Sequence, residues 1–142
     1  MREEDVYHLQ RQIKKLYRRV QRETPVIEGL SMTTLQTLAT LERSGTAMRP
    51  SELGAELQMT SSNVAAALRV LDEQGLIERR ADPDDGRKAY VDLTTEGEKL
   101  IKNVRRTRHA WLQEAADDLL SPQEQRILRK AGELMERLAE RS

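Results

Sequence analysis

The segment that most constrains the fold is 81–88, Ala-Asp-Pro-Asp-Asp-Gly-Arg-Lys. Its Asp, Pro and Gly residues are those that favour tight turns. The runs on either side, 76–80 and 88–93, have the composition of short β-strands. An amphipathic stretch that ends at Gly75 precedes the first run, and Gly commonly terminates a helix. The sequence therefore predicts a helix followed by a two-stranded hairpin with a charged tip.

Apolar residues that recur every three or four positions predict six helices along the rest of the chain. Thr60 is expected to cap the fourth helix, Thr94 or Thr95 the fifth, and Ser121 with Glu124 matches a capping box for the sixth. The expected helices are 4–22, a second from Ser31 or Thr33 to Ser44, a third from Pro50 through Leu57, 61–74, a fifth up to Leu119, and a sixth through Leu138.

This order predicts a mainly α protein with a small β-hairpin. Two short helices followed by a hairpin constitute a winged helix-turn-helix, which needs only residues 32–94 of a single domain 1–142. The terminal helices, 1–22 and 95–142, carry apolar stripes that so small a module cannot cover, so we expect them to form a homodimer. An intrachain three-helix bundle is the alternative. The expected dimer residues are Leu9, Ile13, Leu16, Trp111, Leu128, Met135 and Leu138.

Composition excludes several other classes of protein. The chain has no cysteine, which excludes disulfides and thiolate metal sites. No apolar run reaches the roughly 20 residues of a membrane span, so a cytoplasmic protein is expected. Its two histidines, His8 and His109, have no nucleophile pattern beside them. We therefore expect no enzyme and no cofactor, although a metal held by both histidines of a dimer is conceivable. The 24 basic and 24 acidic residues cancel, so only their distribution can point to nucleic acid.

The predicted helix 61–74 has the features of a recognition helix. At about 100° per residue, Val64, Ala67, Leu68 and Leu71 share an inner face, whereas Ser62, Ala65, Ala66, Arg69 and Glu73 lie opposite. A helix with small polar residues at its N-terminus fits a DNA major groove. An ordinary core helix is the alternative, and the neighbouring hairpin argues against it.

The hairpin tip places Arg87 and Lys88 after a turn, where an arginine can enter a narrow minor groove. Alternatively, Arg87 is a surface residue paired with Asp84 or Asp85. Both can hold, since a carboxylate can orient the guanidinium before DNA arrives. For Arg79 and Arg80 we expect one to face phosphates and the other to pair with Asp82.

The chain resembles the multiple-antibiotic-resistance regulator (MarR) family over essentially its whole length. The resemblance lies in the helix order and in the segments 71–79, 82–87 and 91–97. It implies a dimeric winged helix-turn-helix regulator, usually a repressor, that binds a palindromic operator in double-stranded DNA. Many such regulators release DNA when a small aromatic or phenolic ligand binds.

The resemblance also implies roles for individual residues. Together with the residues above, the expected DNA contacts are Arg49, Ser51, Ser61, Ser62, Asn63, Ala66, Arg69, Arg80, Arg87 and Lys88. The expected wing-stabilising residues are Asp82, Asp84 and Asp85, and the candidate ligand residues are Tyr7, Tyr17, Met32, Gln36, Arg108 and Trp111, for which plain packing is the alternative. This chain departs from the family pattern at two places. The family often has a polar residue followed by Arg where this chain has Ala65 and Ala66, and a second wing Arg where this chain has Gly86.

A winged-helix module that binds protein instead of DNA is the competing hypothesis. Clustering of Arg69, Arg79, Arg80, Arg87 and Lys88 on one predicted face argues against it. The two hypotheses differ in salt dependence, since affinity for DNA falls steeply with salt.

Overall fold

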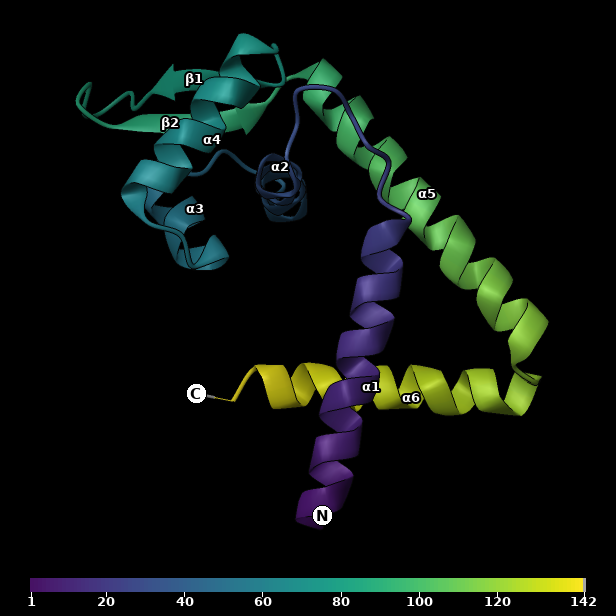
Figure 1. Ribbon diagram of the computed structural model, residues 1–142. Coiled ribbons are helices and arrows are strands. Elements are labelled where there is room, and N and C mark those ends of the chain that lie inside the picture. Colours follow the sequence, from purple (N-terminus) through teal and green to yellow (C-terminus); the bar gives the residue numbers. More distant parts are fainter. Residues whose placement is uncertain (142) are drawn as a thin grey trace. The chain divides into compact units, whose positions relative to one another are not determined.

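The computed structural model describes residues 1–141 and confirms the mainly α fold with one antiparallel hairpin (Figure 1). The chain divides into two compact units, residues 25–105 and residues 1–24 with 106 onward. The elements are α1 (Glu3–Arg22), α2 (Met32–Ser44), α3 (Pro50–Leu57), α4 (Ser61–Glu73), β1 (Ile77–Ala81), β2 (Ala89–Leu93), α5 (Thr95–Leu119) and α6 (Pro122–Ala139).

The predicted helix caps are present. The Thr60 side chain accepts a hydrogen bond from the Asn63 backbone at 3.2 Å, and Ser121 and Glu124 form the capping box of α6. Thr94 caps α5, because its Oγ1 accepts from the Gly97 backbone N–H at 3.1 Å. Gly75 takes φ +69°, a left-handed conformation that glycine adopts without strain. The strands begin one residue later than the sequence predicts, at Ile77 and Ala89.

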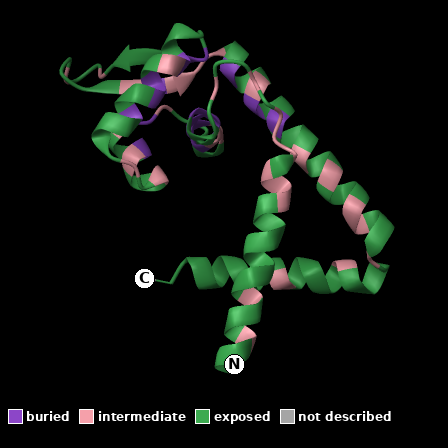
Figure 2. Cartoon of the chain, in the orientation of Figure 1, coloured by how far each residue is buried: buried purple, intermediate pink, exposed green. Residues whose placement is uncertain are grey.

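The unit 25–105 contains the hydrophobic core (Figure 2). Leu38 and Leu53 are fully buried, and Leu68 of α4 packs in the same cluster. Val91 of β2 is also buried and exchanges two backbone hydrogen bonds with Met48, at 2.9 and 2.7 Å. This bridge ties the hairpin to the segment before α3. Recognition elements and hairpin thus share one core.

The start of α5 lies directly on the end of the α4–β1 turn. The Thr94 hydroxyl donates to the Gly75 carbonyl at 2.6 Å. Gly97 is buried, and a Cβ at this position would lie 2.0 Å from the Leu76 carbonyl oxygen. Only a residue without a side chain permits this approach.

The other unit contains most of the exposed apolar surface. α1 and α6 have no buried residue (Figure 2). Within this unit the Arg19 guanidinium stacks over the Trp111 ring at 4.5 Å, and Arg108 Nε donates to Thr24 Oγ1 at 2.8 Å. No helix within residues 1–141 is long and apolar enough to cross a membrane.

Candidate nucleic-acid interface

The outward face of α4 is the one that the sequence predicts. Val64, Ala67, Leu68 and Leu71 are its buried residues. Ser62, Ala65, Ala66, Arg69 and Glu73 are all exposed. The exposed face begins with small side chains, and its first cation is Arg69 one turn before the end. A surface of this shape can approach base edges without a bulky side chain in between.

Two of the predicted contact residues, Ser51 and Ser61, lie together with their neighbours Ala65 and Arg79. Ser51 of α3, Ser61 and Ala65 of α4, and Arg79 of β1 line one surface crevice of about 400 Å³. Arg79 enters it because β1 alternates: Ile77 and Arg79 share one face of the hairpin, and Ile77 is buried in the core. Side chains from both helices and the hairpin therefore border a single surface.

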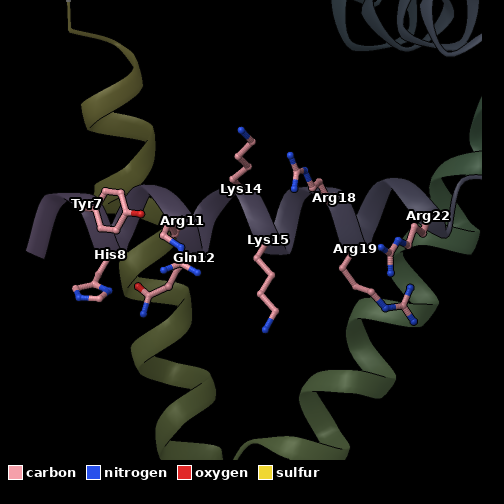
Figure 3. A pocket seen from close by; sticks show the side chains of 9 residues that line it. All are labelled: Tyr7, His8, Arg11, Gln12, Lys14, Lys15, Arg18, Arg19 and Arg22. Carbon is pink, nitrogen blue, oxygen red and sulfur yellow. The ribbon is translucent and has the colours of Figure 1, made fainter.

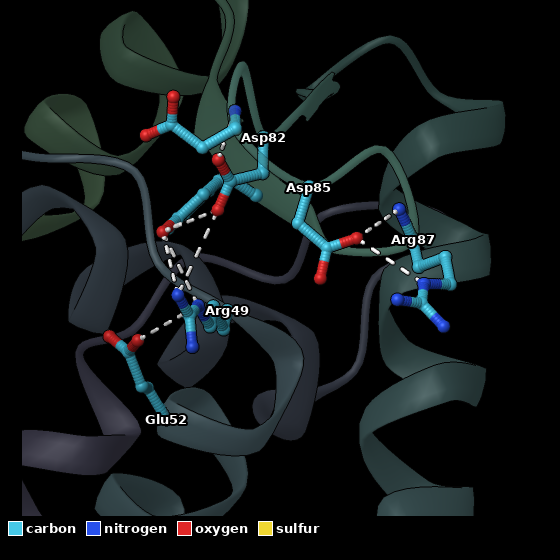
Figure 4. Close-up of polar contacts among 7 residues, drawn as sticks. Arg49, Glu52, Asp82, Asp85 and Arg87 are labelled. Atoms are coloured by element: carbon cyan, nitrogen blue, oxygen red, sulfur yellow. Dashed lines mark hydrogen bonds and ion pairs between the residues drawn. The ribbon is translucent and has the colours of Figure 1, made fainter.

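Arg49 precedes α3 and is held by β2 and the wing (Figure 4). Its Nη2 donates to the Tyr90 hydroxyl at 3.0 Å, and its guanidinium lies 5.3 Å from the centre of the Tyr90 ring. Tyr90 in turn donates to Asp82 Oδ2 at 3.4 Å. Carboxylates of Glu52 and Asp82 each lie 3.9 Å from the Arg49 guanidinium. We call these four residues the Arg49 cluster.

The Arg49 cluster favours the charged forms of Arg49 and Asp82. The hydrogen bond to Tyr90 is the largest cause that raises the pKa of Arg49 above its usual value, followed by the charge interaction with Tyr90. The pKa of Asp82 is lowered chiefly by the backbone hydrogen bond from Asp84. Desolvation, the second-largest effect, raises this pKa, whereas a second such bond from Asp85, the Tyr90 hydroxyl and the charge of Lys88 lower it further. Arg49 is thus a fixed cation at the start of α3.

Tyr90 is a residue of this site that the sequence analysis missed. Its signal is the alternation of β2, in which Tyr90 and Asp92 lie on the face opposite Val91. A tyrosine on the outer face of a wing strand has an apolar ring to cover and a hydroxyl that seeks a partner.

We expect Tyr90→Phe to lower the free energy of unfolding by about 1 kcal/mol, because it removes the hydroxyl that links Arg49 to Asp82. Urea denaturation followed by circular dichroism measures this change. Tyr17→Phe is the matched control, since Tyr17 is 56% exposed and should change stability by less than about 0.5 kcal/mol. Equal effects of the two substitutions would contradict the cluster's role.

The wing pairs its cations with carboxylates. Asp85 accepts from both the backbone N–H and the Nε of Arg87, at 3.1 and 3.4 Å, which confirms the predicted local pair (Figure 4). The Arg87 side chain nevertheless remains 94% exposed. Asp82 accepts from the Asp84 backbone N–H at 2.9 Å, so Asp84 supports the turn through its main chain.

The expected pairing of Arg79 or Arg80 with Asp82 is wrong. Arg80 bonds to Glu78 at 2.7 Å and lies 3.3 Å from Asp92, and Arg79 lies 3.9 Å from Asp72. The reason is the strand geometry: Arg80, Glu78 and Asp92 share the outer face of the hairpin. Asp82 lies beyond β1, where Arg49 and Tyr90 reach it. The hydrogen bond that Arg80 donates to Glu78 is the first cause of the raised pKa of Arg80.

Asp82 should also make stability depend on pH. A carboxyl whose folded-state pKa is depressed stabilises the fold above its unfolded value of about 3.9 and loses this effect as the pH falls through the folded value. The stability difference between the wild type and Asp82→Asn should therefore be largest at neutral pH. It should shrink steadily as the pH falls below about 4. Urea denaturation at a series of pH values measures this, and a difference that does not change with pH would contradict it.

The candidate ligand residues belong to both units. Tyr7, Tyr17, Arg108 and Trp111 lie in the unit of α1 and α6, and Met32 and Gln36 lie in the unit 25–105. Gln36 lines a pocket of about 440 Å³ beside Asn63 and Ala66 of α4. Arg108 also reaches Gln21 Oε1 at 3.4 Å. Within residues 1–141, no three His, Cys, Asp or Glu side chains are grouped as a metal site.

A hairpin behind two short helices, with a cationic tip, defines a winged helix-turn-helix protein. The sequence model described as "MarR family" matches residues 28–88. An uncharacterized HTH-type transcriptional regulator of Mycobacterium bovis is 33% identical over 113 residues, which are 80% of this chain and 78% of that protein. The chain belongs to the MarR family, and its relatives are transcriptional regulators.

Further relatives extend the comparison. The transcriptional repressor MprA of Escherichia coli is 27% identical, and the alignment covers 78% of this chain and 64% of the length of MprA. The crystal structure of a candidate transcriptional regulator of Pseudomonas aeruginosa is 35% identical, with a TM-score of 0.85 over 98% of this chain and 95% of that one. A MepR variant of S. aureus bound to an oligodeoxyribonucleotide has the same fold, with a TM-score of 0.68, 22% identity and coverage of 94% and 96%.

Proposed function

We propose that this MarR-family chain regulates transcription by binding double-stranded DNA, with α4 in a major groove and the wing in a neighbouring minor groove. The observation that supports this most is the exposed face of α4. Up to Arg69, this face carries small side chains and no acidic residue. It belongs to the same unit as the exposed Arg87. The proposed base and groove contacts are Ser61, Ser62, Asn63, Ala66, Arg69, Arg87 and Lys88, and Arg49, Ser51 and Arg80 are proposed to contact phosphates.

A salt titration of DNA binding tests this proposal. Fluorescence anisotropy with a random-sequence duplex between 50 and 200 mM salt should show affinity falling steeply, since each neutralised phosphate adds about −0.9 to the logarithmic slope. One observation favours the competing protein-interaction module: residues 25–105 contain 10 basic and 13 acidic residues. Affinity that is absent, or insensitive to salt, would support that module instead.

We further propose that the chain acts as a homodimer through α1, α5 and α6. The support is the exposure of apolar side chains on these helices, including Ile13 at 43%, Leu128 at 42% and Leu138 at 66%. A two-fold dimer would present two copies of α4 to a palindromic site. We propose a second copy of this chain as the partner of this apolar surface, because a two-fold dimer would cover these side chains on both chains at once.

Leu138→Glu should weaken such a dimer at least about tenfold, because it places a charge in an apolar interface. Sedimentation equilibrium measures this directly, and the wild type should have twice the chain mass of 16.3 kDa. Val26→Glu is the matched control, since Val26 is fully exposed and lies in the other unit. A monomeric wild type would contradict the proposal.

The regulatory outcome that we propose is repression relieved by a small aromatic or phenolic ligand. Support for repression comes from the relative MprA, which is named as a repressor. Support for a ligand is the pocket of about 440 Å³ that Gln36 shares with Asn63 and Ala66, because its size suits a small molecule and residues of α4 line it. A promoter–reporter assay with and without the protein, repeated with benzoate-type compounds, tests both parts.

A further inference from the structure

The last four turns of α1 form a cationic surface that the proposed DNA-reading elements do not use. Residues 6–22 contain six Lys or Arg residues and no acidic residue. Five of them are exposed and lie within an arc of about 100° at 100° per residue. These five, the α1 cationic stripe, are Arg11, Lys14, Lys15, Arg18 and Arg22 (Figure 3). With Tyr7 and His8 they line an open cleft of about 780 Å³.

The stripe carries charge that the protein does not neutralise. Within residues 1–141 none of its five members forms an ion pair. Arg19, in contrast, pairs with Glu23 and stacks on Trp111. Like charges three and four residues apart on a helix repel one another, and an ordinary solvated helix face mixes both signs. The stripe therefore costs stability that an anionic partner would recover.

The proposed dimer would leave the stripe exposed to solvent. Leu9, Ile13, Leu16 and Val20 lie on the side of α1 about 180° from the centre of the stripe. A second copy that covers this apolar side leaves the cations exposed. The partner of the stripe is therefore distinct from the second copy proposed above.

The two units carry opposite net charges, and the positive one contains the stripe. Residues 25–105 contain 10 basic and 13 acidic residues, a net charge of −3. Residues 1–24 and 106–142 contain 14 basic and 11 acidic residues, a net charge of +3. The unit that carries the recognition helix thus lacks the overall positive charge that attracts a phosphate backbone. The stripe lies in the other unit, whose net charge is positive.

Its geometry suits a linear polyanion. Arg11 to Arg22 spans about 16 Å along the helix at 1.5 Å per residue. One DNA strand carries about five phosphates over that length. We propose that the α1 cationic stripe is a second, sequence-independent contact for the phosphate backbone of duplex DNA. This inference rests on the proposed function, because it takes DNA as the protein's ligand.

The test is the salt dependence of binding by a neutralised variant. Arg11→Gln, Lys15→Gln, Arg18→Gln and Arg22→Gln together remove four charges and retain good helix formers. The matched control removes four charges from α6 of the same unit, through Arg126→Gln, Arg129→Gln, Lys130→Gln and Arg137→Gln. Circular dichroism and sedimentation establish that both variants are folded and have the wild-type oligomeric state. Each is titrated onto a random-sequence 60-bp duplex between 50 and 200 mM salt.

Counted per chain, the stripe variant should reduce the logarithmic salt slope by roughly 2 to 3.6, and by up to about twice that in the proposed homodimer. It should also reduce the affinity at 50 mM salt at least about tenfold, while the α6 control keeps the wild-type slope. Equal losses in both variants would mean a net-charge effect only and would overturn the inference, as would no loss in either. Loss of binding to phosphatidylserine vesicles without a change on DNA would overturn it in favour of a membrane surface. If the wild type itself binds no DNA, the proposed function fails; if only the slope difference is missing, the inference alone fails.

Discussion

Gly97→Ala should destabilise the protein by about 3 kcal/mol or more, the upper range for overpacking a rigid site. The added Cβ would lie 2.0 Å from the Leu76 carbonyl oxygen and 3.0 Å from its carbonyl carbon. Both atoms are backbone, so no side chain can rotate away. α5 would have to move off the end of α4, and the bond from Thr94 to Gly75 would be lost with it. Thermal and urea denaturation measure the effect.

Gly132→Ala is the matched control for this prediction. Gly132 lies inside α6, and among residues 1–141 no atom outside the neighbouring residues and backbone of its own helix lies within 4 Å of the position that its Cβ would take. The same change of residue should therefore stabilise the protein by up to about 1 kcal/mol through helix propensity. Similar destabilisation by both substitutions would show that the close contact of α5 with Leu76 does not control folding.

Arg87→Ala should lower affinity for DNA by about 10-fold or more and reduce the logarithmic salt slope by about 1 per chain, or about 2 for the proposed homodimer. The Arg87 side chain is 94% exposed and is oriented by Asp85, so its removal should leave stability within about 0.5 kcal/mol. Weaker binding without weaker folding would assign the loss to the interface. Anisotropy titrations at several salt concentrations measure it.

Lys99→Ala is the control for charge. It removes one exposed cation from α5 in the same unit and lies outside the proposed interface. Its affinity and slope should match those of the wild type. If Arg87→Ala binds DNA as the wild type does, the wing does not contact DNA and the proposed orientation of the hairpin is wrong.

The elements of this fold were predictable because each has a local signal. Thr60, Ser121 and Gly75 mark helix ends through capping and a positive φ, and the period of α4 assigns Val64 and Leu68 to the core. These effects act over a few residues, so the sequence displays them directly. The resemblance to the MarR family was visible for the same reason, in short segments around the hairpin.

Long-range contacts were not predictable in this way. Arg49 and Tyr90 are 41 residues apart, and neither has a local signal for the other. The partner expected for Asp82 was wrong because strand alternation places Arg80 on the same face as Glu78 and Asp92, with which it pairs. The role of Gly97 depends on the backbone of Leu76, which only the packed structure brings close.

Selection of DNA from a random-sequence pool tests the central claim most directly. The purified protein is mixed with the pool at several salt concentrations, and the bound DNA is sequenced over successive rounds. We predict enrichment of a palindrome whose half-sites are one helical turn apart, about 10 bp, as two copies of α4 in a two-fold dimer require. Binding without an enriched motif would contradict the assignment of α4 as a recognition helix.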